Sequence, residues 1–235
     1  RRVVEKGVCP DDVTVIPNGV DAALYHPAQE PPPLPGMERA DGELLVGYLG
    51  NFGASQNIPA LVEAAARLEA AGERVRVVLA GDGTDRERVL ACAARAGLRS
   101  LAVHGSIPKE RTRAFYNACD ACLVPLAAVA AMQETIPSKL FEVMACEVPV
   151  VLSAAGEAAA VVERSGCGVV AAPADPEAIA AAILRVRDAG ADARARMGRA
   201  GGEYVRRNFD RSALAGRYLE LLARVAGRAA GGEPR

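Results

Sequence analysis

The sequence predicts an α/β fold in which one parallel sheet is covered by helices on both faces. Three observations lead to this prediction. Short β-branched or aliphatic runs alternate with helical segments between residues 44 and 171, and glycine turns follow several of these runs. The chain has 235 residues, 51% of them hydrophobic, which is enough to bury a sizeable core. Strands that alternate with helices are joined by right-handed crossovers, which makes such a sheet parallel and doubly wound.

The first predicted strand is the β-branched segment VTVIPNGVD at 13–21, which ends in a Pro-Asn-Gly turn. A proline-rich connector at 27–36 separates it from an apolar strand at 44–50 and a helix at 57–71 with apolar residues at helical spacing. The later segments repeat this alternation, with a loop at 126–134. We expect further strands at 75–80, 101–104, 121–125, 148–152 and 168–171, and helices at 84–96, 108–118, 137–146, 157–164, 176–188, 192–208 and 211–228. Together they form a Rossmann-like domain.

The two ends of the chain are expected to lie outside this sheet. Residues 1–12 have the composition of the end of a preceding N-terminal domain and its linker, so we expect the nucleotide-binding domain to span 13–208. Asp175 precedes Pro and Glu and is expected to cap the first of the C-terminal helices. Residues 209–228 form a helix with one apolar face, which predicts docking on another surface; attachment to a membrane surface is the alternative. Residues 229–235 are expected to be disordered.

The stretch ETIPSKLFEVMACEVPVV at 134–151 is expected to form the centre of a ligand site. Pro137 suits the first position of a helix, because its missing N–H would be unpaired there, so Glu134 precedes the helix and Glu142 lies inside it. The unpaired first-turn N–H groups and the helix dipole favour an anion. Lys139 adds a mobile ammonium group. Glu142 is placed to accept hydrogen bonds from a vicinal diol such as a ribose and Glu134 to reach beyond the anion, which suits a sugar nucleotide.

Other candidate residues follow predicted strands, and in sheets of this class ligands lie beyond the carboxyl ends of the strands. The first such turn contains Gly50, Asn51, Phe52 and Gly53, and the second contains Gly81 and Gly83. A glycine turn between a strand and a helix lets the backbone approach a phosphate closely, although each turn by itself is also a common structural turn. His104 ends another strand, where a structural histidine is the favoured interpretation.

These motifs together resemble a known family. Glu134 and Glu142, eight positions apart and followed by a MAC helix end and the strand PVV, are similar to the donor-site signature of the retaining glycosyltransferases of family 4, which have the two-domain GT-B fold. The string Pro-Ser-Lys-Leu-Phe-Glu inside it resembles the sugar transferases of bacterial surface-polysaccharide assembly. IPNGVD at 16–21 is similar to the segment that opens the C-terminal domain of these enzymes.

The resemblance implies that this chain is the C-terminal, donor-binding half of such an enzyme, with a nucleotide sugar as substrate and the acceptor-binding N-terminal half absent. It implies catalytic roles for Glu134 and Lys139, with no metal and no cofactor. The expected donor contacts are the two glycine turns, the helix start at Ile136, Pro137 and Ser138, the ribose-binding Glu142, and backbone around His104 and Ile107 for the base. The family commonly has an arginine and a Lys-Gly pair where this chain has Asn51 and Gln56-Asn57, so Lys139 is expected to supply the missing charge.

Composition narrows the function classes further. The chain has 28 basic and 29 acidic residues, so no field of one sign favours nucleic acid or an anionic membrane. The six cysteines are scattered, which fits a reducing, cytoplasmic location; peripheral contact with the inner face of a membrane, through the absent domain, is left open. Cys119 and Cys122 form a C-x-x-C pair, but with two histidines in the chain we expect buried thiols there rather than a zinc site.

Two other functions remain open at this stage. A sugar-nucleotide epimerase or hydrolase of the same architecture needs an acid and a base near the sugar, for which Glu134 and His104 are the candidates. A non-catalytic nucleotide-binding module is the second alternative, and the absence of the usual arginine and lysine from the 50–57 turn favours it. The sequence does not specify the base, the sugar or the acceptor.

Overall fold

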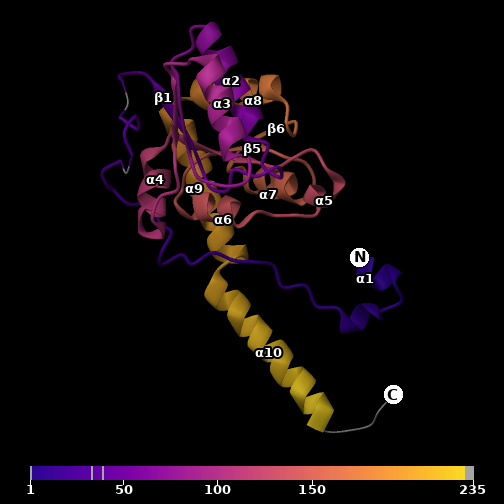
Figure 1. The fold of residues 1–235 in the computed structure, drawn as a ribbon. Helices are drawn as coiled ribbons and strands as arrows, with labels where there is room; N and C mark the ends of the chain where they lie inside the picture. The colour runs from indigo at the N-terminus through magenta and orange to yellow at the C-terminus, as the bar shows by residue number, and fades with distance from the viewer. Residues whose placement is uncertain (1, 33, 39, 231–235) are drawn as a thin grey trace.

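The computed structural model describes residues 2–32, 34–38 and 40–230. Its centre is one sheet in which six parallel strands lie in the order β3-β2-β1-β4-β5-β6 (Figure 1). The strand order proceeds outward in opposite directions from the neighbouring pair β1 and β4, so the switch point of the doubly wound sheet lies between them. The strands are β1 (Leu44–Leu49), β2 (Val75–Ala80), β3 (Leu101–His104), β4 (Ala121–Pro125), β5 (Val150–Ser153) and β6 (Gly168–Ala171).

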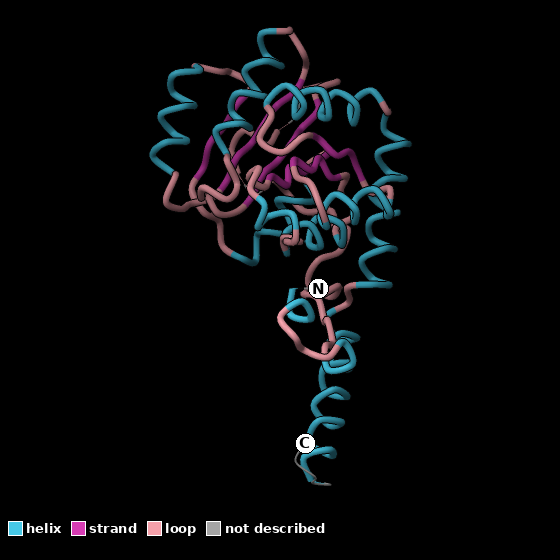
Figure 2. Tube along the Cα trace, turned by 90° about the vertical axis from the view of Figure 1, so that its right-hand side faces the viewer, coloured by secondary structure: helices cyan, strands magenta, loops and turns pink. Residues whose placement is uncertain are grey.

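Helices cover both faces of this sheet, and a separate apolar cluster fills each interface (Figures 1 and 2). One face carries α2 (Ile58–Ala70), α3 (Arg86–Ala96) and α8 (Pro176–Asp188), and the other carries α4 (Thr112–Ala118), α6 (Ser138–Ala145), α7 (Glu157–Ser165) and α9 (Gly190–Asn208). Burial on both faces explains why the strands are continuous apolar runs without polar alternation. The predicted α/β, doubly wound, Rossmann-like fold is confirmed.

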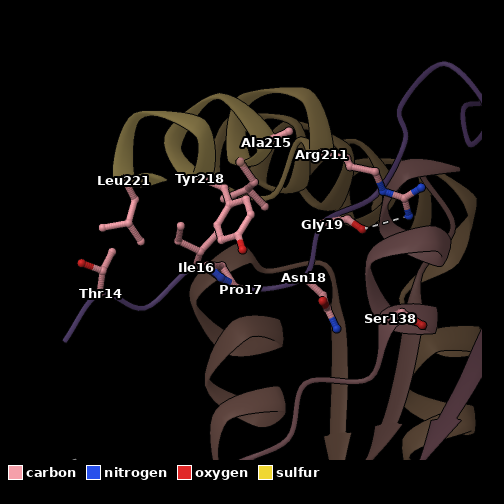
Figure 3. A pocket seen from close by; sticks show the side chains of 11 residues that line it. Thr14, Ile16, Pro17, Asn18, Gly19, Ser138, Arg211, Ala215, Tyr218 and Leu221 are labelled. Carbon is pink, nitrogen blue, oxygen red and sulfur yellow. Dashed lines mark hydrogen bonds between the residues drawn. The ribbon is translucent and has the colours of Figure 1, made fainter. Parts of the chain in front are cut away.

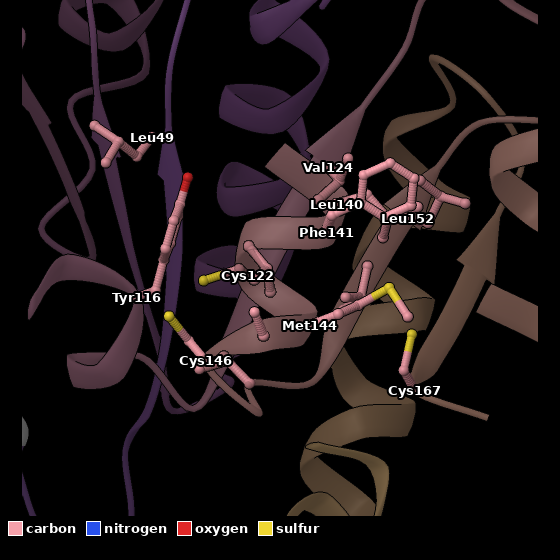
Figure 4. Packing of buried hydrophobic residues seen from close by; sticks show 14 of the residues in the cluster. Leu49, Tyr116, Cys122, Val124, Leu140, Phe141, Met144, Cys146, Leu152 and Cys167 are labelled. Carbon is pink, nitrogen blue, oxygen red and sulfur yellow. The ribbon is translucent and has the colours of Figure 1, made fainter. Parts of the chain in front are cut away.

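Helix α6 is fixed by its apolar face. Leu140, Phe141 and Met144 are buried against residues of β4 and β5 such as Val124 and Leu152 (Figure 4). Phe141 also stacks on Phe209, with ring centroids 4.2 Å apart. Each fully buried side chain of this size contributes roughly 1.5–3 kcal/mol, so the helix is firmly anchored. Its opposite, partly exposed face is thereby held at the carboxyl end of the sheet.

The C-terminal helix α10 (Arg211–Ala230) extends away from the domain, and the N-terminal segment with α1 (Arg2–Glu5) and η1 (Pro10–Asp12) lies off the sheet on the same side (Figures 1 and 2). The strand predicted at 13–21 is wrong. Val20 makes a single bridge to Asp210, and the preceding residues have no neighbouring strand with which to pair, so their β-branched side chains do not form a ladder.

Other boundaries differ for identifiable reasons. The helix predicted from 84 starts at Arg86, because Asp85 N–H donates to the carbonyl of Phe52 and holds a turn. Helix 108–118 is divided into η2 (Lys109–Arg111) and α4, and the loop at 126–134 contains α5 (Ala130–Gln133). The strand predicted from 148 starts at Val150, since Pro149 has no N–H for the ladder.

The cap predicted at Asp175 is present: its carboxylate accepts hydrogen bonds from the N–H groups of Glu177 and Ala178. Residues 229 and 230 belong to α10, whereas the rest of the predicted tail, 231–235, lies outside the described residues. Across the described ranges, no helix combines the length and the apolar run that crossing a bilayer requires.

Candidate nucleotide-sugar site

A cavity of about 550 Å³ lies at the carboxyl ends of β1 and β2, beside the switch point of the sheet. Parallel α/β sheets bind ligands at this place. Both glycine turns, the start of α6 and one side of α4 contribute to its wall. The lining residues are Tyr25, Leu49, Gly50, Asn51, Gly81, Asp82, Ser106, Ile107, Lys109, Thr112, Tyr116, Ser138, Lys139 and Glu142.

The two glycine turns pack backbone against backbone. Gly50 N–H donates to the carbonyl of Ala80, and Phe52 N–H donates to that of Asp82. A Cβ at Gly81, where φ is +156°, would lie 1.8 Å from the carbonyl oxygen of Gly50, and a Cβ at Gly83 would lie 2.5 Å from that of Phe52. Glycine is therefore required at both positions, which leaves the backbone of this corner open to a ligand.

Lys139 extends from the first turn of α6 across the end of β1. Its Nζ lies 3.6 Å from the centroid of the Tyr48 ring, and a Cβ at Gly50 would lie 2.4 Å from that Nζ. Burial lowers the pKa of Lys139 to about 7, against the opposing effects of Glu142 and Cys122. The ammonium group is thus packed rather than mobile, which corrects the sequence-based expectation.

Glu142 lies one turn further along the same face of α6. Its Oε2 accepts a hydrogen bond of 2.9 Å from the hydroxyl of Tyr116, a residue of α4. Burial, and then the nearby Glu142 carboxylate, raise the pKa of Tyr116, so its hydroxyl stays a donor. The Tyr25 ring packs 6.4 Å from that of Tyr116 and completes this side of the wall. The remaining lone pairs of Glu142 face a cavity and are available to hydroxyl donors.

The start of α6 supplies the anion-binding feature expected from the sequence. Pro137 has extended geometry (φ −69°, ψ 136°) and precedes Ser138, the first helical residue. As in any helix, the first N–H groups have no intrahelical acceptor. Ser138 lines the cavity, so these groups lie at its edge together with the Lys139 ammonium.

The structure does not bring every predicted site residue to the cavity wall. Gly50, Asn51, Gly81, Ile107, Ser138, Lys139 and Glu142 line it, whereas Phe52, Gly53, Gly83, His104, Glu134, Ile136 and Pro137 do not. Phe52 is fully buried beneath the turn. His104 donates from Nε2 to the carbonyl of Pro35 at 2.9 Å, which fits the structural interpretation. Glu134 ends α5 at the exposed surface, and its catalytic role remains a prediction.

Several wall residues were missed by sequence reasoning. Thr112 and Tyr116 stand four positions apart in a helix that follows η2, and this spacing could have placed both on one face. Lys109 and Ser106 follow β3 and so belong to the same strand-end pattern as the glycine turns. Tyr25 comes from the connector, whose path no local pattern predicts.

The buried-thiol prediction is confirmed for the C-x-x-C pair. Cys119 and Cys122 are both buried, and neither forms a disulfide. Within the described part of the chain, no group of three or more His, Cys, Asp and Glu side chains is arranged to hold a metal ion.

A second groove, of about 640 Å³, lies on the other side of Ser138 between residues 14–19 and α10 (Figure 3). Its wall is mostly apolar, with Ile16, Leu214 and Tyr218 among its residues, and Arg211 donates to the carbonyl of Gly19 across one end at 3.4 Å. Tyr218 is 53% exposed and Val15 is 75% exposed. This groove lies outside the sheet and lacks the glycine turns, so we assign the ligand site to the cavity at the strand ends.

Comparison with known proteins decides the family. The model of the family "Glycosyl transferases group 1" matches residues 36–204, which contain every strand of the sheet and the whole cavity wall except Tyr25. The chain belongs to the group 1 glycosyl transferases. This agrees with the broader part of the sequence-based recognition.

Individual relatives support this assignment. The chain is 28% identical over 189 residues to 2-deoxystreptamine glucosyltransferase of Streptomyces kanamyceticus, covering 80% of this chain and 47% of that one. Sucrose-phosphate synthase from Thermosynechococcus elongatus superposes with a TM-score of 0.75 at 26% identity, over 90% of this chain and 52% of that one. HepE of Anabaena, in complex with UDP and glucose, gives 0.76 at 20%, over 94% and 59%. The fold is that of the C-terminal half of a GT-B glycosyltransferase, and this chain spans about half the length of these proteins.

Proposed function

We propose that this chain is the donor-binding half of a retaining glycosyltransferase of family 4, which binds a nucleoside-diphosphate sugar for transfer to a saccharide or lipid-linked acceptor. The observation that carries the proposal is the convergence of Lys139, the start of α6 and Glu142 on one cavity at the switch point. A cation and free N–H groups fit a diphosphate, and a carboxylate one turn away fits a ribose diol. The complex of HepE with UDP and glucose supports the ligand class.

In this proposal catalysis is electrostatic. As the bond between the sugar and the diphosphate breaks, negative charge develops on the leaving phosphate oxygen. Lys139 and the first N–H groups of α6 stabilise that charge, and the partly enclosed cavity strengthens the interaction relative to water. Glu142 holds the ribose, and Glu134 contacts the donor sugar. The departing phosphate then assists attack by the acceptor on the same face, which retains the configuration of the sugar.

The acceptor site belongs, in this proposal, to an N-terminal half that the relatives have and this chain lacks. The exposed apolar residues of α10 and of the 14–19 segment would contact that half, as the docking helix predicted at 209–228 requires. The isolated chain would then bind donor without transferring its sugar. The Pro-Ser-Lys-Leu-Phe-Glu string favours polysaccharide assembly in the cytoplasm, with membrane contact through the absent half.

Calorimetry with UDP tests the roles of the two catalytic candidates. Lys139→Ala should weaken binding more than Glu134→Ala, because a charge-assisted contact to phosphate is roughly twice as strong as a neutral hydrogen bond. We expect a loss of about tenfold or more for Lys139→Ala and a loss of less than about threefold for Glu134→Ala, which lies beyond the nucleotide. Equal affinities for the two variants would contradict the assignment. Transfer of sugar by this chain alone would refute the division into halves.

A non-catalytic nucleotide-binding module is the second candidate. Asn51 donates from its side-chain amide to Gln56 at 3.4 Å, where the family pattern has cations, so the 50–53 turn brings no charge of its own to the cavity. A transfer assay on a full-length parent protein distinguishes the two functions. Nucleotide binding without turnover of any labelled nucleotide sugar would favour the module.

A further inference from the structure

Tyr48 touches both elements that the proposed function assigns to the diphosphate. It is the second-last residue of β1 and is fully buried. Its hydroxyl donates to the carbonyl oxygen of Asn51 at 2.7 Å, and the Lys139 ammonium lies over its ring at 3.6 Å from the centroid. One side chain therefore contacts the glycine turn at one end and the cation at its face.

The hydroxyl of Tyr48 has a specific partner. Burying a hydroxyl without a hydrogen bond is costly, and a phenylalanine would fill the same space without that cost. The bond to Asn51 closes the 50–53 turn three residues beyond Tyr48 itself. Burial also raises the pKa of Tyr48, so the hydroxyl remains a donor. The orientation of the turn, and with it of the backbone that faces the cavity, depends on this contact.

The ring of Tyr48 holds the cation. Lys139 reaches it by crossing Gly50, where no Cβ stands in the way. The carboxylate that acts on the charge of Lys139, Glu142, is itself engaged by the Tyr116 hydroxyl. A cation over an aromatic face gains about 0.5–2 kcal/mol, depending on how far it is removed from water. The ring thus keeps the ammonium at the cavity wall until an anion arrives.

We propose that Tyr48 is a positioning residue for the donor diphosphate, setting the distance between the Lys139 ammonium and the backbone of the 50–53 turn so that one ligand meets both. This inference rests on the proposed function. Tyr48 does not line the cavity, so it acts through its two neighbours and makes no contact with the substrate.

The chain offers a direct readout, because it contains three lysines: Lys6, Lys109 and Lys139. In protein labelled with ¹³C,¹⁵N-lysine, the Lys139 side-chain signals are identified by their loss in Lys139→Met. Titration followed by NMR then gives the pH midpoint of that one ammonium group. Besides Tyr48, the titratable groups around it are Glu142 on the same helix, Cys122 on β4, Tyr116 on α4, Tyr25 on the connector, and Asp82 and Lys109 at the rim.

Two substitutions separate the ring from the hydroxyl. Tyr48→Phe keeps the ring, so the Lys139 midpoint should stay within about 0.3 pH units of the wild type while affinity for UDP falls about threefold through the loosened turn. Tyr48→Leu removes both contacts. Its midpoint should fall by about 0.5 to 1 pH unit, because the ring no longer favours the charged form, and affinity for UDP should fall about tenfold or more.

The outcomes separate the inference from the proposed function. If the wild type binds none of UDP, GDP, TDP and ADP, the proposed function fails and this inference with it. If the wild type binds UDP but both Tyr48 variants match it in affinity and in the Lys139 midpoint, only the inference is overturned. If Tyr48→Leu does not fold, the wild type and Tyr48→Phe decide. Ring-current displacement of the Lys139 side-chain protons should be present in both, and its absence would overturn the inference.

Discussion

Binding of a nucleoside diphosphate should depend on the protonation of Lys139. Burial holds the pKa of this side chain at about 7, below its ordinary value, so the charged form prevails below pH 7 and is lost above it. A bound diphosphate favours the charged form, which raises the pKa and makes binding take up a proton. The protonated fraction of the free protein falls from about one half at pH 7 to about 3% at pH 8.5. The dissociation constant for UDP should therefore rise about tenfold over this interval.

Isothermal titration calorimetry at half-unit steps of pH, in two buffers of different ionisation enthalpy, measures both the affinity and the proton uptake. The second ionisation of a phosphate lies near pH 6, so the ligand itself changes little above pH 7. Lys139→Arg should bind with an affinity independent of pH over this range, because a guanidinium stays protonated. A wild-type affinity that is equally flat, with no proton uptake, would refute the reasoning from burial to charge.

The same side chain should cost the fold stability. Between about pH 7 and 10.5 the unfolded chain binds the Lys139 proton and the folded chain does not, so stability rises with pH across this window. The full difference corresponds to roughly 5 kcal/mol, which partial exposure reduces to about 2 kcal/mol. In urea denaturation, Lys139→Met should be more stable than the wild type by about 2 kcal/mol at pH 6.5, with the gap narrowing towards pH 10. A Met variant that is less stable at pH 6.5 would contradict this.

The remaining predictions concern the glycine corner and the carboxylate. Gly81→Ala should lose about 2–4 kcal/mol in thermal or urea unfolding, because its Cβ would meet the carbonyl of Gly50 at a strained φ; the matched control Gly105→Ala, which has open space around its Cβ, should lose less than about 1 kcal/mol. Tyr116→Phe should weaken UDP binding about three- to tenfold by freeing Glu142, and an unchanged calorimetric affinity would argue against a ribose contact there.

Much of the fold could be predicted because local patterns and tertiary packing agree. Strands 75–80, 101–104, 121–125 and 168–171 are observed as expected, since each is an apolar run bounded by turns and buried on both faces. The strand expected at 13–21 failed because β-branched residues favour a strand only where a neighbouring strand pairs with them. Its pattern is local, whereas the sheet edge that it needed is absent there.

The candidate site divides in the same way. The positions of Gly50, Gly81 and Ser138 follow from the rule that loops at the carboxyl ends of parallel strands meet. The contact between Lys139 and Tyr48 does not follow from it, because those residues are 91 positions apart and their approach depends on the packing of α6 against β1 and on the missing side chain of Gly50. The sequence therefore predicted a mobile ammonium where the structure has a packed one.

The central claim, that the cavity binds a nucleoside diphosphate, is tested most directly by thermal unfolding of this chain with UDP, GDP, TDP and ADP, alongside Lys139→Ala and Glu142→Ala. A ligand at about a hundred times its dissociation constant stabilises by roughly 2.7 kcal/mol, which for a domain of this size raises Tm by about 5–10 °C. We predict such a shift with at least one nucleotide and its loss in both variants. No shift with any nucleotide, or an equal shift in the variants, would contradict the account.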